Sequence, residues 1–310
     1  MSSPEVWLAA TAAISALFGL ACPGLSRRLR PAAAVWLLSG GSLLVAAGAM
    51  VVPALVVVTV VGQWPPLARL GEWSARPLAS SVSADGVVAM AATTILVVQS
   101  WRLGRVLWVR GRGLVSAWLA CRGVSTELVV IPDGAPVALA VPGWPGRVLV
   151  SRAFLRLMQP EQWRAVLAHE RGHLRARHDL HLLAGSVAAA VDPLLARVPA
   201  ALRLATERSA DEMSAALTGD RRLVADAIGS AAMLCSIDAH PAWAMRATGS
   251  DVSLRVRHLL DGPPPQRPLG QAALVSLTAA AVAVAAFALF DTKHLFEFAE
   301  RTQQLVSLHR

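Results

Sequence analysis

The residues best suited to chemistry are two histidines and a glutamate in the sequence His169-Glu170-Arg171-Gly172-His173. Side chains four positions apart lie on the same face of a helix, so both imidazoles can bind one metal ion. The glutamate would then stand beside the attacking water and act as general base. The spacing predicts a site for one Zn²⁺ per chain and the hydrolysis of peptide bonds.

A zinc peptidase needs a third protein ligand and an open position for water. Glu207, the first residue of a later Glu-Arg-Ser-Ala-Asp sequence, is the favoured third ligand. His178 and His181 are its rivals. The long HExxHxxGxxH arrangement is disfavoured, because Asp179 stands where its third histidine would be and its glycine is missing.

Two further acidic residues are candidates for supporting the metal ligands. Asp211 lies four positions after Glu207, so both share a face of the expected helix. A ligating histidine usually donates its second N–H to such a carboxylate, which fixes its tautomer. Asp179 has two interpretations: it supports a metal ligand in the same way, or it forms a solvated ion pair with Arg175 or Arg177. Arg208 follows Glu207 and is either a transition-state donor or a surface arginine.

The elements that must position these residues include membrane-spanning helices. Of the 310 residues, 55% are hydrophobic and 16% are charged, and the mean hydropathy is +0.51. This composition excludes a disordered or purely polar soluble protein. Since a spanning helix needs about 20 apolar residues, the sequence predicts four spans, at residues 5–21, 33–61, 86–101 and 271–290.

Arginines beside these spans predict how the chain crosses the membrane. The net charge is +9, but the cations are not gathered on one basic helix with interleaved aromatics, so we expect no direct binding of nucleic acid. Arginines follow the first span, as at Arg27 and Arg28, and the third span, as at Arg102 and Arg105. The positive-inside rule therefore places the N-terminus outside and residues 102–268 in the cytoplasm.

Between the third and fourth spans we expect one folded domain. Residues 127–151 predict three short strands separated by turns, and a helix that carries the HExxH motif should begin near Pro160. The strand at 137–141 offers an edge to which an extended substrate could add. Residues 182–205 favour a buried or membrane-surface helix pair over a fifth span.

The expected fold is thus a mainly α membrane protein with about four transmembrane helices and a cytoplasmic α+β, zincin-like metallopeptidase domain. That domain would consist of a small sheet and the HExxH helix with its neighbours. The expected organisation is three transmembrane helices in 1–101, the metallopeptidase domain in 102–268, the fourth span in 269–290 and a short extracytoplasmic tail in 291–310.

The chain resembles the BlaR/MecR-type antirepressor metallopeptidases, which are zinc-dependent gluzincins of bacterial membranes, and overlaps the heat-shock and CAAX-processing membrane gluzincins. The resemblance covers roughly residues 127–215 and rests on the segments 146–151, 159–161, 165–173, 178–179 and 207–211, and on the order of the spans and the domain. It implies His169, His173 and Glu207 as zinc ligands and Glu170 as catalytic base. It also implies a bacterial plasma-membrane location and a protein substrate, typically a transcriptional repressor.

The best-known members carry a penicillin-binding sensor domain after the fourth span, and we expect this chain to lack it. About 20 residues follow that span, and Phe290 stands where an SxxK motif ending at Lys293 would need serine. A stimulus would therefore reach the enzyme through the 62–85 loop, the tail, the spans or a sensor partner.

Three functions are consistent with these observations. The favoured one is zinc-dependent cleavage of a cytoplasmic protein, such as a transcriptional repressor in a signalling pathway. The second is a membrane quality-control or processing protease of the heat-shock or CAAX type. The third is a non-catalytic membrane receptor with a structural zinc, which the complete set of ligands and base disfavours.

Overall fold

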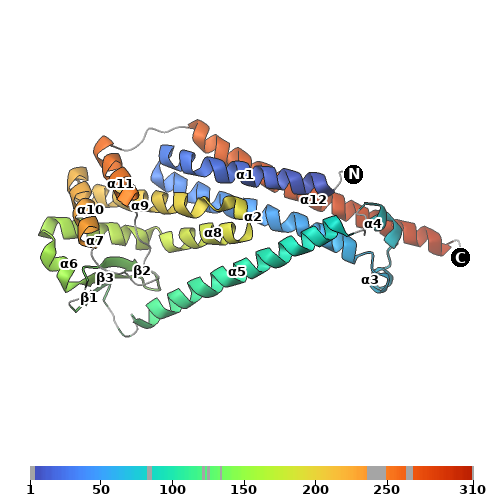
Figure 1. Ribbon diagram of the computed structural model, residues 1–310, viewed down its shortest axis with the longest axis horizontal. Helices are drawn as coiled ribbons and strands as arrows, with labels where there is room; N and C mark the ends of the chain where they lie inside the picture. The colour runs from blue at the N-terminus through green and yellow to red at the C-terminus, as the bar shows by residue number, and fades with distance from the viewer. Residues whose placement is uncertain are drawn as a thin grey trace.

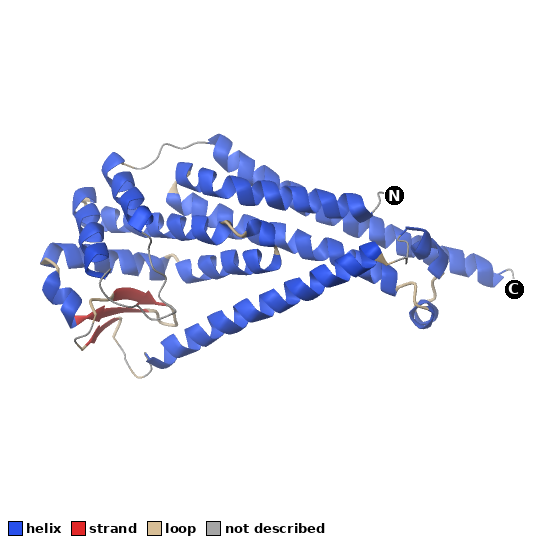
Figure 2. Ribbon diagram, viewed as in Figure 1, coloured by secondary structure: helices blue, strands red, loops and turns tan. Residues whose placement is uncertain are grey.

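A computed structural model describes residues 4–81, 86–120, 123, 126–132, 135–235, 249–262 and 268–308. The molecule is elongated and mainly helical, with a small sheet near one end (Figures 1 and 2). Its helices are α1 (Pro4–Arg28), α2 (Pro31–Val61), α3 (Pro65–Leu70), α4 (Ala75–Ser81), α5 (Val87–Ala120), α6 (Arg152–Leu157), α7 (Pro160–Arg175), α8 (His178–Val191), α9 (Val198–Thr218), α10 (Arg221–Cys235), α11 (Gly249–Asp261) and α12 (Pro268–Leu308), with a 3₁₀ turn, η1 (Pro193–Leu195), between α8 and α9.

Four helices in the described part of the chain, α1, α2, α5 and α12, are long and apolar enough to cross a membrane, as predicted. They run along the long axis of the molecule (Figure 1). The last one continues as a helix through most of the expected tail. Its added turns are held in place because Leu295 and Ala299 pack on Leu78 of α4, and the N–H of Ser74 donates to the carbonyl of Ala299 at 2.9 Å.

The sheet has three strands, as predicted, in the order β1-β3-β2. These are β1 (Leu128–Ile131), β2 (Ala138–Val141) and β3 (Arg147–Ser151). In register, Val129 lies opposite Leu149 in the parallel pair β1–β3, and Leu139 lies opposite Leu149 in the antiparallel pair β2–β3. β2 is therefore an edge strand, and it is the strand nearest the helix that carries the HExxH motif.

A local core fixes that helix, α7, against the sheet. The side chains of Val148 and Val150 from β3 are buried with Phe154 of α6 and Ala165 of α7. The hydroxyl of Ser151 accepts the N–H of Phe154 at 3.1 Å and caps α6, as its position before a helical pattern predicts. α7 begins at Pro160, where a proline is favoured because its fixed φ suits the first turn.

α8 and α9 form an antiparallel hairpin that packs on the spans rather than on the sheet (Figure 1). Leu195, Val198 and Leu202 share one buried core with Phe18 of α1 and Leu38 of α2. Residues 182–205 therefore form a helix pair with one face buried against the spans. The part of the chain that bears the HExxH motif is joined to the membrane-spanning bundle through a continuous apolar contact.

The tip of this hairpin approaches α1 so closely that only glycine fits at the contact. A Cβ atom on Gly19 would overlap the carbonyl oxygen of Leu194, whereas a Cβ atom on Gly24 of the same helix would meet nothing within 4 Å. We expect Gly19→Ala to lower the free energy of unfolding by about 1–3 kcal/mol, the usual cost of overpacking a tight contact. Gly24→Ala should leave it unchanged or raise it, because alanine favours a helix over glycine. Thermal unfolding in detergent would measure both, and equal midpoints would contradict the contact.

Candidate metal centre

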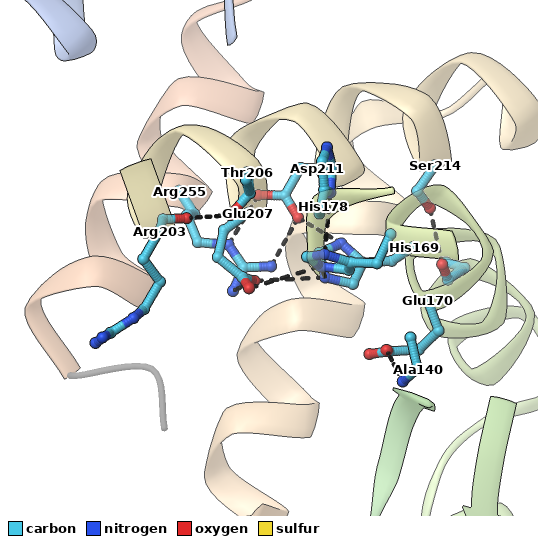
Figure 3. A network of polar contacts seen from close by, with 12 residues as sticks. Ala140, His169, Glu170, His178, Arg203, Thr206, Glu207, Asp211, Ser214 and Arg255 are labelled. Carbon is cyan, nitrogen blue, oxygen red and sulfur yellow. Dashed lines mark hydrogen bonds and ion pairs between the residues drawn. The ribbon is translucent and has the colours of Figure 1, made fainter. Parts of the chain in front are cut away.

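α7 and α9 bring the predicted metal ligands together from two segments of the chain. Gly172, inside the HExxH motif, lies against Ala210, because a Cβ on this glycine would be 3.4 Å from the alanine Cα. The hydroxyl of Ser214 donates to the carbonyl of Ala165 at 2.8 Å and ties the two helices together further along. This close approach places Glu207 of α9 opposite the two histidines of α7, and Figure 3 shows Glu207 facing His169.

His169, His173 and Glu207 have ligand atoms that all lie within 4.8 Å of one another. The two Nε2 atoms are 3.1 Å apart, and they lie 3.5 and 3.6 Å from the two carboxylate oxygens of Glu207. Tetrahedral zinc with ligands at about 2.1 Å requires ligand atoms roughly 3.4 Å apart. The distances and the donor set of two imidazoles and one carboxylate therefore fit a catalytic zinc site.

The two imidazoles are held by different partners. Nδ1 of His169 lies 2.9 Å from a carboxylate oxygen of Asp211. Nδ1 of His173 lies 3.0 Å from Nδ1 of His178. Asp211 thus has the position expected for a supporting carboxylate. His178 contacts His173 on the side of the ring away from the metal site and is not itself one of the three candidate ligands.

Arg255 of α11 completes the site, and the sequence analysis missed it. Its side chain is buried; Nη1 lies 2.9 Å from Glu207, and Nε and Nη2 donate to the two oxygens of Asp211 at 2.8 and 2.7 Å. Arg255 lies far along the chain from α7 and belongs to no motif, so nothing in the sequence distinguishes it from the other 28 basic residues. Only the folded structure identifies it as the counter-charge of both carboxylates.

Glu170 points away from this ion-pair cluster and toward the sheet. Its Oε2 accepts the backbone N–H of Ala140 in β2 at 2.6 Å (Figure 3). The carboxylate therefore lies between the edge strand and the metal ligands, the place where a base must act on a peptide held along that strand.

The other residues singled out from the sequence have other partners, although Asp179 lines the same cavity as the metal ligands. Asp179 has its carboxylate 3.8 Å from Arg177, a partly exposed ion pair. The ring of His181 contacts Ser39 and Trp36 of α2. Arg208 is buried and donates to the backbone carbonyls of Ser26 and Arg27 at the end of α1, so it is not a surface arginine.

A cavity of about 840 Å³ extends from the ligands. It reaches between the edge strand, the spanning helix α5 and the helix α8, with apolar walls to which these elements contribute Ala138, Ala140, Leu114, Ala117, Leu182 and Leu183. The metal ligands and Glu170 lie on the same cavity. The site is therefore open to a substrate of peptide size.

Burial and charge set the protonation of the metal-free site. Burial by itself lowers the pKa of His169, but its contacts with Asp211 and Glu207 outweigh this effect and raise the pKa to about 10. Burial lowers the pKa of His173 to about 4 and raises that of Glu170 to about 7. Burial would also raise the pKa values of Glu207 and Asp211, but the neighbouring Arg255 holds both below their usual range.

Zinc binding should therefore release a proton. Without metal, His169 is protonated at pH 7.5, whereas a ligand must present a free lone pair, so loading one zinc displaces about one proton per site. Calorimetric titrations in two buffers of different ionisation enthalpy would count it. Asp211→Asn should lower the count, because the histidine pKa then falls. Equal heats in both buffers for the wild type would contradict this assignment.

Comparison with known proteins agrees with the geometry. Residues 119–197 match the peptidase family M48, and the match contains the whole HExxH motif but ends before Glu207. Neither the curated proteins nor the solved structures gave a match. Residues 119–197 therefore match a peptidase family M48 domain, and the chain is a zinc metallopeptidase with four candidate membrane spans among the described residues and with His169, His173 and Glu207 as its candidate metal site.

Proposed function

We propose that this metallopeptidase cleaves a cytoplasmic protein, a transcriptional repressor in a signalling pathway, in the manner of the BlaR/MecR-type enzymes that the sequence resembles. The observation that carries the proposal is the position of Glu170, between an edge strand and a His-His-Glu ligand set on one open cavity. A purely structural zinc site would be closed by a fourth protein ligand.

We infer that the catalytic end of the molecule faces the cytoplasm of a bacterium and that the N-terminus lies outside. Arg27 and Arg28 end α1, and the sheet and α7 lie toward the same end of the long axis (Figure 1). Membrane-spanning helices tend to keep their arginine-rich ends in the cytoplasm, which supports this orientation. We propose that residues 102–268 form the metallopeptidase domain, between the transmembrane helices of 1–101 and the fourth span at 269–290. Residues 291–310 would then lie outside the cell.

In the proposed mechanism the chain supplies ligands, a base and a substrate track. When bound, zinc polarises the scissile carbonyl and lowers the pKa of the attacking water. Glu170 takes a proton from that water and passes it to the leaving amine. Asp211 keeps the His169 ring oriented with Nε2 toward the metal site, and Arg255 keeps Glu207 in place.

We propose that the substrate binds in an extended conformation along β2. The outer edge of this strand lies on the cavity, and strand addition supplies backbone hydrogen bonds that do not depend on the substrate sequence. The N–H of Ala140 now bonds Glu170, so strand addition frees this carboxylate for proton transfer.

One observation favours the second candidate, a quality-control or processing protease for membrane proteins. The cavity wall includes α5, which is itself a spanning helix, and α8, which packs on the spans. A substrate segment that leaves the bilayer beside α5 would enter the cleft directly.

The decisive variant is Glu170→Gln in the full-length protein. It should keep its zinc, because the ligands are intact, and lose cleavage by about 10²-fold or more, the usual contribution of a general base. Glu161→Gln is the matched control, since Glu161 lies exposed at the start of the same helix. Zinc content by elemental analysis and cleavage of casein would be followed on the same samples.

The substrate is identified by comparing protein N-termini in cells that express the wild type or Glu170→Gln. We expect cells with the wild type, but not cells with Glu170→Gln, to contain new N-termini that arise by cleavage of a DNA-binding repressor. New N-termini confined to membrane proteins would favour the quality-control function. Undiminished cleavage by Glu170→Gln would refute the catalytic role of this residue.

A further inference from the structure

One ring nitrogen of His178 contacts a candidate metal ligand, and the other is buried. Its Nδ1 lies 3.0 Å from Nδ1 of His173, and its side chain is almost fully buried. Its Nε2 has no hydrogen-bond partner among the residues that the structure describes. The ring is therefore held by packing and by a single contact, the one to His173.

The tautomers follow from the direction of the metal site. Nε2 of His173 faces His169 and Glu207, so its lone pair must be free for a metal and its proton must lie on Nδ1. That N–H donates to Nδ1 of His178, which acts as acceptor. Such a contact behind a ligating histidine fixes both the tautomer and the ring orientation.

His178 is also the first residue of α8, and this helix is bound to two spans. Nδ1 of His181 lies 2.8 Å from the hydroxyl of Ser39 in α2. That hydroxyl donates to the carbonyl of Val35 at 2.7 Å, so the histidine N–H is the donor. The ring of Trp36 meets the same histidine edge to face, with centroids 4.6 Å apart.

The spanning helix α5 also contacts α8, through two arginine hydrogen bonds. Arg110 donates to the hydroxyl of Ser186 at 3.1 Å, and Arg102 donates to the carbonyl of Ala189 at 3.2 Å. A shift of α2 or α5 relative to α7 must therefore move α8 or break these contacts.

We propose that His178 is a positioning residue for the zinc ligand His173, and that α8 makes this positioning depend on how the spans α2 and α5 are packed. The first clause concerns metal binding and the second concerns regulation of the same site; both rest on the proposed zinc peptidase function. Displacement of α8 would withdraw the acceptor behind His173 and weaken the zinc site without touching a ligand.

Zinc affinity of the detergent-purified full chain, measured by competition with a chromophoric chelator, tests the first clause. His178→Leu removes the acceptor and should raise the zinc dissociation constant about 10- to 100-fold, the usual effect of losing a partner behind a ligand. His178→Asn restores an acceptor at the position of Nδ1 and should recover most of the affinity. A residue that only filled space would give the opposite order, since leucine fills the site better than asparagine.

A double-mutant cycle tests the second clause. Ser39→Ala, which is remote from the metal ligands, should weaken zinc binding in the wild type but add little in a His178→Leu background, because both changes act through one contact. Ser42→Ala is the matched control: its hydroxyl donates to the carbonyl of Ser39 within α2, and removing it should leave zinc affinity unchanged.

Besides that reversed order of zinc affinities, four results would overturn the proposal or part of it. Unchanged affinity in His178→Leu would refute the positioning role and leave the peptidase function standing. Additive effects of Ser39→Ala and His178→Leu, or no effect of Ser39→Ala, would refute the coupling through α8. A wild type that binds no zinc would overturn the proposed function as well.

Discussion

The pairing of Arg255 with Glu207 and Asp211 is the interaction on which the candidate metal site depends. Two carboxylates a helical turn apart, Asp211 fully buried and Glu207 partly buried, repel each other and lose hydration, and a single buried guanidinium compensates both. Breaking such a pair leaves an uncompensated buried charge, which costs far more than an exposed pair is worth. The contact also joins α11 to α9, so it holds the last helix before α12 against the site.

The same charges bear on how the site would accept a metal ion. With His169 protonated, the two cations and two carboxylates cancel. If zinc replaced the proton, the cluster would gain one positive charge beside the cavity that the ligands line. Such a site would stabilise negative charge developing on a substrate carbonyl, which is the kind of preorganised electrostatics that lowers a barrier.

The sequence sufficed for features that depend on local pattern. Four apolar helices, three short strands and the start of α7 at Pro160 follow from hydropathy, turn residues and capping, all of which act over a few residues. The HExxH spacing indicated the ligand histidines for the same reason. Glu207 was chosen because a carboxylate at its position has Asp211 one turn away.

Contacts between distant segments could not be predicted in this way. The role of Arg255 depends on α11 packing beside α9, and that of His178 depends on a ring orientation set by the turn after α7. The docking of α8 and α9 on the spans depends on shape, including the glycine contact at α1. A 3.6-residue pattern indicates that a helix has a buried face but not which helix covers it.

The shared core of the hairpin and the spans means that the peptidase part is not a detachable module. Leu195, Val198 and Leu202 would face water if residues 102–268 were cut out, and an apolar surface of that kind aggregates. Such a fragment would have lost the partner that its helices fold against, even with every ligand residue present. The helices that carry the candidate ligands and the spans thus share one core, so a change in lipid composition or bilayer thickness that shifted the spans would also act on the active site.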